Sequence, residues 1–147
     1  MPSLTDTYIE NRVIVNPNDA NNLGAAHGGN VMKWMDEVAA MSAMRYAGET
    51  CVTARMDQTN FRRPIPQADV ALVKAYVFDH GRTSVQTRVR VFREDPLSGE
   101  TELTTESYMV FVAIDDDGDP TPVPEELTIE TERGQELYDA AVNGKED

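Results

Sequence analysis

Residues 29–47 read GNVMKWMDEVAAMSAMRYA, and this stretch decides the architecture of the chain. It has the length and composition of a long helix, and Gly48 follows it as a residue that commonly ends helices. Apolar side chains occupy almost every side of this helix: Val31, Met32, Trp34, Met35, Val38, Ala39, Ala40, Met41, Ala43 and Met44. A helix with so little polar surface is expected to be buried on more than one side.

Strand-like segments flank the helix. One precedes it, separated by a polar, glycine-containing loop over residues 16–29, and four follow it with short connections. The predicted strands are residues 7–15, 51–61, 69–79, 82–94 and 101–115.

The alternation of side chains supports these strands. Within residues 82–94, Val85, Val89 and Val91 share one face, whereas Gln86, Arg88 and Arg90 share the other. Short connections favour antiparallel pairing. The prediction is an α+β hotdog fold, in which one curled antiparallel sheet of about five strands surrounds one long central helix.

The length of 147 residues suits one domain. We expect a core over about residues 7–115 and an acidic C-terminal extension over about 116–147, with a short helix over 125–142. Cys51 is the single cysteine, so an internal disulfide is impossible. No apolar run reaches the roughly 20 residues that span a bilayer, and the first residues do not resemble a signal peptide. These features predict a cytoplasmic protein without a membrane partner.

The charge is strongly negative: 26 acidic residues against 13 basic ones give a net charge of -13, and only three of the basic residues are lysines. Such a field repels nucleic-acid backbones, so nucleic-acid binding is not expected. Acidic residues cluster in 115–119 and 124–126, which is typical of a disordered acidic tail. They also populate the predicted folded part, which favours a surface adapted to high salt.

Asp36 stands about two turns inside the predicted helix, at the border of its most apolar face. One interpretation makes it the edge of the polar stripe that Lys33 and Glu37 carry. The other makes it a partly desolvated carboxylate that acts as a general base or nucleophile.

Gly28 and Gly29 stand where the helix begins. They allow an ordinary helix start, but their backbone N–H groups also lie at the positive end of the helix dipole, where an oxyanion or thioester carbonyl is readily held. His27 suggests a general base, although a lone loop histidine is more often structural. Asn21 and Asn22 are ordinary loop residues whose amides can orient water.

Other chemistries find less support. Ser42 and Ser84 lack a nucleophile-elbow motif. His27 and His80 are far apart, and no ligand spacing recurs, so a metal site is not expected.

Four segments resemble, in order and spacing, the hotdog-fold acyl-CoA thioesterases of the brain-type, cytosolic acyl-CoA hydrolase kind. They cover roughly residues 10–124: NNLGAAHGGNVMKWMDEVA (21–39), VTARMDQTNFRRPI (52–65), HGRTSVQTRVRV (80–91) and YMVFVAIDDDGDPTPVP (108–124).

The resemblance implies hydrolysis of acyl-CoA to a free acid and CoA, without a cofactor beyond the CoA of the substrate. It implies that Asp36 is the catalytic carboxylate, that Asn21 works with it across a dimer interface, and that the N–H of Gly29 or a neighbour holds the thioester oxygen. It also implies a homo-oligomer, a dimer at least and commonly a trimer of dimers.

The same resemblance assigns contacts with the substrate and its CoA part to the residues His27, Gly28, Arg62, Arg63, Gly81, Arg82, Thr83 and Ser84. Arginine suits phosphate because its planar fork binds two oxygens. Pairing with surface acids is the competing interpretation for the arginines, and we expect it for Arg88 and Arg90.

Two other functions stay open. A hotdog hydratase or dehydratase needs a histidine paired with an acid, for which His27 and Asp36 are candidates in an unsuited motif. An acyl-CoA-binding module that lacks turnover has the same fold, because fold alone does not fix function. The presence of Asn21 and Asp36 argues against the binding module. The methionines of the helix favour core packing over an acyl tunnel.

Overall fold

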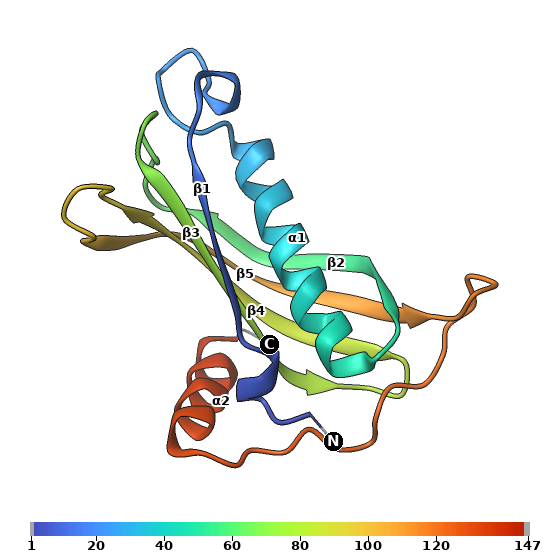
Figure 1. The fold of residues 1–147 in the computed structure, drawn as a ribbon. Helices are drawn as coiled ribbons and strands as arrows, with labels where there is room; N and C mark the ends of the chain where they lie inside the picture. Colours follow the sequence, from blue (N-terminus) through green and yellow to red (C-terminus); the bar gives the residue numbers. More distant parts are fainter. Residues whose placement is uncertain (1, 146–147) are drawn as a thin grey trace.

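One antiparallel sheet and one long helix form the body of the computed structural model, which describes residues 2–145 (Figure 1). The five strands lie in the order β1-β3-β4-β5-β2, all neighbours antiparallel. The helices are α1 (Gly28–Ala47) and α2 (Glu132–Gly144), and short 3-10 turns cover Thr5–Thr7 and Pro17–Asp19. The strands are β1 (Ile9–Ile14), β2 (Thr50–Phe61), β3 (Val70–His80), β4 (Ser84–Glu94) and β5 (Thr101–Ile114).

This is the predicted hotdog arrangement, with a sheet that curves along α1 but does not close. Every strand begins and ends within two residues of its predicted range, and α1 begins one residue early. Gly48 ends α1 as expected, with a φ of 68° and its N–H bonded to Met44 O.

The main core lies between α1 and one face of the sheet. Met35, Ala39 and Ala43 of α1 are fully buried against it. Alternate residues of β3 and β4, among them Val77 and Val85, point to the same layer.

The opposite side of α1 stays open within one chain. Met32, Met41 and Met44 are 39%, 42% and 36% exposed. The prediction that this helix is buried on more than one side is therefore wrong for the single chain, because one sheet covers only one side of a helix. The expectation of core packing holds for Met35 alone among the four methionines of α1.

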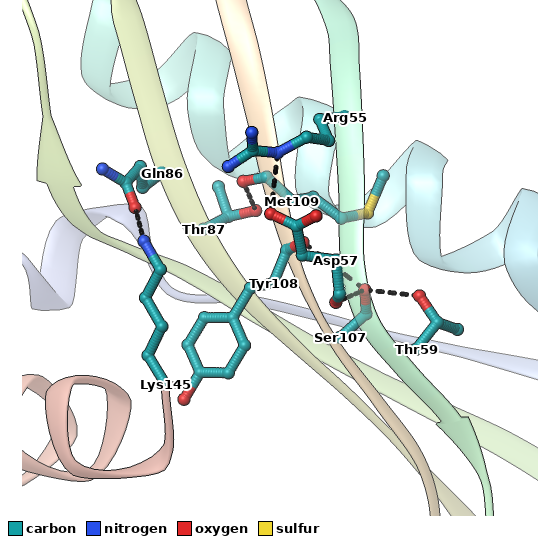
Figure 2. A network of polar contacts seen from close by, with 9 residues as sticks. All are labelled: Arg55, Asp57, Thr59, Gln86, Thr87, Ser107, Tyr108, Met109 and Lys145. Carbon is teal, nitrogen blue, oxygen red and sulfur yellow. Dashed lines mark hydrogen bonds and ion pairs between the residues drawn. The ribbon is translucent and has the colours of Figure 1, made fainter. Parts of the chain in front are cut away.

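The outer face of the sheet, meaning the face opposite α1, is partly covered by α2. Tyr76 donates to Leu137 O at 2.6 Å, and Tyr108 donates to Ala141 O at 2.7 Å. Figure 2 shows Tyr108 beside the end of α2, where Lys145 bonds to Gln86.

The C-terminal helix begins at Glu132, whereas the sequence predicts a helix over 125–142. Thr131 caps it by accepting a hydrogen bond from Gly134 N at 2.9 Å. The segment before it runs alongside the start of the chain, where Leu4 N donates to Thr128 O. The predicted extension reaches residue 147, and its last two residues lie outside the described part.

Strand β2 forms one edge of the sheet and is irregular. Its register shifts twice, between Thr53 and Arg55 and between Asp57 and Asn60. Gln58, which lies within the second shift, has a φ of 52°. Within residues 2–145, β2 pairs with β5 alone, so its other edge offers backbone groups to a further strand.

Neither helix in residues 2–145 combines the length and the apolar character that a bilayer crossing requires.

Tyr46 predicts how stability changes at alkaline pH. It is 1% exposed and donates to Pro124 O at 2.6 Å, and burial raises its pKa to about 12. The folded state favours the neutral form of the Tyr46 hydroxyl. The contribution of this group to the free energy of unfolding is therefore present below pH about 10 and is lost as pH rises toward about 12. In denaturant titrations, Tyr46→Phe should flatten the loss of unfolding free energy over this pH window, and an unchanged slope would contradict the assignment.

Candidate active site

A hollow of about 320 Å³ opens at the N-terminal end of α1. The loop before the helix and the end of β2 form its walls. Polar groups on the wall come from Asn21, Arg62 and Arg63, and apolar ones include Val31 and Ile65.

The helix start places one free backbone donor at this hollow. His27 caps α1, and its Nδ1 accepts a hydrogen bond from Gly29 N at 3.2 Å. Gly28 N–H has no hydrogen-bond partner among the described residues. A Cβ on Gly28 would lie 3.9 Å from the Phe61 ring, so this backbone faces the hollow. Of the two glycines, Gly28 is the one whose N–H is free for an incoming carbonyl.

Asn21 shapes the loop and lines the hollow. Its Oδ1 accepts hydrogen bonds from Leu23 N at 2.9 Å and from Ala25 N at 3.2 Å. This turn fixes the side chain. The amino group of Asn21 forms no hydrogen bond to a described residue, so it is the donor left for a ligand or water.

Asp36 is half-buried on α1 and engages a neighbour from β2. Thr53 Oγ1 donates a short hydrogen bond to Asp36 Oδ1. Thr53 lies at the first register shift of β2. This specific hydrogen bond favours a functional carboxylate over the interpretation of Asp36 as the edge of a polar stripe. The sequence did not point to Thr53, because a threonine in a strand is not distinguished by its local pattern.

Within one chain, these groups lie apart. Asp36 follows Gly28 by eight positions in the helix, about 12 Å along the axis. No hydrogen bond among the described residues joins Asn21 to Asp36. One chain therefore places the Asp36 carboxylate with its hydroxyl partner in one region, and the free backbone N–H of the helix start in another.

The Gly81–Ser84 turn lies at the far end of α1 from the hollow. It connects β3 to β4, and the His80 ring lies 5.4 Å from the ring of Tyr46 in the last turn of α1. A helix of 20 residues is about 30 Å long. The predicted CoA-binding residues thus form two groups at opposite ends of α1: His27, Gly28, Arg62 and Arg63, and then Gly81, Arg82, Thr83 and Ser84.

The rim arginines of the hollow are weakly paired. Arg62 lies 3.8 Å from Glu106, and Arg63 lies 3.8 Å from Glu102. Both arginines are more than half exposed, so these pairs are weak and open to competition.

The expectation that Arg88 and Arg90 pair with acids is wrong for the described chain. Neither lies within ion-pair distance of a described carboxylate, since the strand register places Tyr108 opposite Arg88, and Glu106 opposite Arg90 turns to Arg62.

No group of three His, Cys, Asp or Glu side chains in residues 2–145 is placed to hold a metal ion. Hydrolysis without a metal stays a prediction.

Comparison with known proteins decides the family. The family model described as the thioesterase superfamily matches residues 23–100. The chain belongs to the thioesterase superfamily. Its relatives include the uncharacterized acyl-CoA thioester hydrolase YkhA of Bacillus subtilis, 39% identical over 86% of this chain and 73% of that protein.

Solved thioesterase structures share the fold over nearly the whole chain. An acyl-CoA hydrolase of Staphylococcus aureus, solved with butyryl coenzyme A and coenzyme A, is 33% identical with a TM-score of 0.86, over 96% of this chain and 85% of that one. A hexameric acyl-CoA thioesterase is 36% identical with a TM-score of 0.86, over 96% of this chain and 90% of that one.

The Staphylococcus aureus enzyme has also been solved with alanine in place of an asparagine, an aspartate and a threonine. Those three positions are separated by 15 and then 17 residues. Asn21, Asp36 and Thr53 have the same residue types in the same order and with the same separations.

The cap that His27 provides can be tested separately from any chemical role. His27→Ala should lower the free energy of unfolding by about 1 kcal/mol, because Gly29 N–H loses its acceptor. His27→Asn retains a capping acceptor, so it should keep both stability and thioester turnover. Turnover that is lost in the stable His27→Asn variant would place His27 in the chemistry.

Proposed function

We propose that the protein hydrolyses acyl-CoA thioesters to a free carboxylic acid and CoA. The observation that carries the proposal is the Asp36 carboxylate, which is held by Thr53 on a helix whose N-terminus opens into a hollow. Membership of the thioesterase superfamily supports it, and so do the relatives named as acyl-CoA thioester hydrolases. CoA is then part of the substrate and of the product, and the reaction needs no further cofactor.

The reaction begins when the thioester carbonyl oxygen accepts a hydrogen bond from the free N–H of Gly28, with Gly29 beside it. The helix dipole favours the negative charge that develops on this oxygen. The Asn21 amide orients a water molecule, and Asp36 takes a proton from that water as it attacks the carbonyl carbon.

The tetrahedral intermediate then collapses, the carbon–sulfur bond breaks, and the proton on Asp36 passes to the departing CoA sulfur. The products are one carboxylic acid and one thiol. Thr53 keeps the carboxylate in one orientation throughout, because its hydroxyl occupies Oδ1.

Two copies of the chain would assemble a complete site. Asp36 and Thr53 of one copy would face Asn21 and Gly28 of the other, since they lie about 12 Å or more apart within one chain. The exposed methionines of α1 and the free edge of β2 supply the surface for this contact. Hexameric relatives support a homo-oligomer. We propose a dimer at least, arranged as a trimer of dimers.

We also propose that the protein acts in the cytoplasm and that its acidic surface serves in high salt. Support for both comes from composition: a single cysteine and a net charge of -13.

Asp36→Asn should lower kcat about 10²–10⁴-fold, because the amide cannot accept the proton of water. Free-thiol release from acyl-CoA measures this at low and molar salt. Glu37→Gln is the matched control, since it removes an exposed charge from the next position of α1 and should retain activity. Full turnover in Asp36→Asn would contradict the mechanism, and saturable binding without turnover by the unaltered protein would favour a binding module.

Mixing variants tests whether the site is shared. Asn21→Ala and Asp36→Asn homo-oligomers should each be nearly inactive. After the two variants are unfolded and refolded together in equal amounts, each mixed dimer should contain one intact site. Random pairing makes about half of the dimers mixed, so the whole mixture should recover up to about a quarter of the unaltered activity. No recovery in confirmed mixed dimers would show that both residues act from the same chain.

A further inference from the structure

The second register shift of β2 decides which way the Phe61 side chain points. The register pairs Asp57 with Tyr108, and it pairs Phe61 with Thr105. Four steps along β2 therefore face three steps along β5, so β2 contains one extra residue, as in a β-bulge. Since successive side chains of a strand alternate between the two faces, this insertion turns Phe61 away from the face of Asp57 and toward the face that α1 covers.

Specific contacts hold this bulge in place. Gln58 has a φ of 52°, a conformation that residues other than glycine rarely adopt. Thr59 Oγ1 lies 2.9 Å from Ser107 Oγ, and Ser107 also donates to Asp57 O at 2.8 Å, as Figure 2 shows. The backbone that leads to Phe61 is thus fixed, and bulges are frequent where a side chain is re-aimed beside a functional site.

The Phe61 ring lies beside the free backbone donor of the helix start. Its Cε1 and Cζ are each 3.9 Å from the position that a Cβ on Gly28 would take, which is van der Waals contact. The ring is nevertheless 50% exposed, whereas Phe78 and Phe111 are at most 3% exposed. One exposed apolar side chain is ordinary on a protein surface, but a bulge directs this one to the N–H that binds the thioester carbonyl in the proposed reaction.

The chemistry of the hollow indicates which part of the substrate meets this ring. Phe61 adds to an apolar wall that includes Val31 and Ile65. An acyl chain gains by leaving water for such a wall, whereas the amide groups of the pantetheine arm would lose hydrogen bonds against it. The acyl chain is therefore the part of the thioester that packs on Phe61.

The ring also limits the space next to the thioester carbonyl. A carbonyl oxygen that accepts from Gly28 N–H lies about 2.9 Å from the nitrogen, so the first carbons of the acyl chain pass close to a ring that already contacts Gly28. A straight chain can lie along the ring. A branch on the α-carbon adds a methyl group where the ring and the helix backbone leave little room, and close-packed contacts resist such additions.

We propose that Phe61 determines the acyl specificity of the site and favours acyl groups that are unbranched next to the thioester carbonyl. This inference rests on the proposed function and names its substrate class, straight-chain acyl-CoA. Phe61 acts by contact with the acyl chain and takes no part in proton transfer.

Butyryl-CoA and isobutyryl-CoA test the proposal, because these isomers differ only in the branch at the α-carbon. The unaltered protein should have a kcat/KM for butyryl-CoA about tenfold or more above that for isobutyryl-CoA. Phe61→Ala should bring this ratio close to one, mainly by raising kcat/KM for isobutyryl-CoA. Phe61→Tyr retains the ring and should retain the ratio. Phe92→Ala is the matched control, since it removes a partly buried ring outside the hollow and should leave the ratio unchanged.

A ratio near one in the unaltered protein, or the same ratio in Phe61→Ala as in the unaltered protein, would overturn the proposal. If that unchanged ratio came with a smaller oligomeric mass in light scattering, Phe61 would be a subunit contact instead. Absence of turnover of both isomers by the unaltered protein would refute the proposed function but leave Phe61 testable. Calorimetric titration with the two intact thioesters would then have to show a Kd ratio that Phe61→Ala brings close to one, and an unchanged Kd ratio would reject the role of Phe61.

Discussion

Packing of α1 against one face of the sheet is the interaction on which the rest of the structure depends. It buries Met35, Ala39 and Ala43 completely, and it fixes where the helix begins and ends relative to the strands. The same contact leaves Met32, Met41 and Met44 partly exposed, because a single sheet covers only one side of a helix. Burial of these exposed methionines requires a second layer of protein against α1, which another copy of the chain can supply.

The exposed side of α1 also carries the candidate catalytic carboxylate. The carboxylate of Asp36 lies on the side of α1 that the sheet leaves partly open, and Thr53 reaches it from the edge strand β2. The free N–H of Gly28 lies two turns away along the helix. A two-fold partner that covers the open side would bring a second helix start toward the first carboxylate, which explains why a catalytic site would form at an interface.

The distribution of charge adds a second constraint. A protein with a net charge of -13 that binds a phosphorylated substrate has to concentrate positive charge locally. The partners of its arginines show how: Arg55 and Arg12 are neutralised by nearby carboxylates, Arg62 is weakly paired, and Arg90 is left without a carboxylate partner in the described chain. Arg62 and Arg63, the two arginines that line the hollow, are thus held only by weak, exposed ion pairs.

The order of elements, the extent of α1 and the antiparallel sheet could be predicted from the sequence, because hydrophobic periodicity and turn residues are local signals. Asp36, Asn21 and the paired glycines stood out for the same reason, as departures from a local pattern. Thr53 did not, since a threonine in a strand is ordinary until its neighbour across space is known. The tertiary structure alone decided that Thr53 meets Asp36, that His27 occupies Gly29 N–H and leaves Gly28 free, and that Arg90 lacks a carboxylate, because hydrogen bonds and charge pairs depend on contacts between segments far apart in the chain.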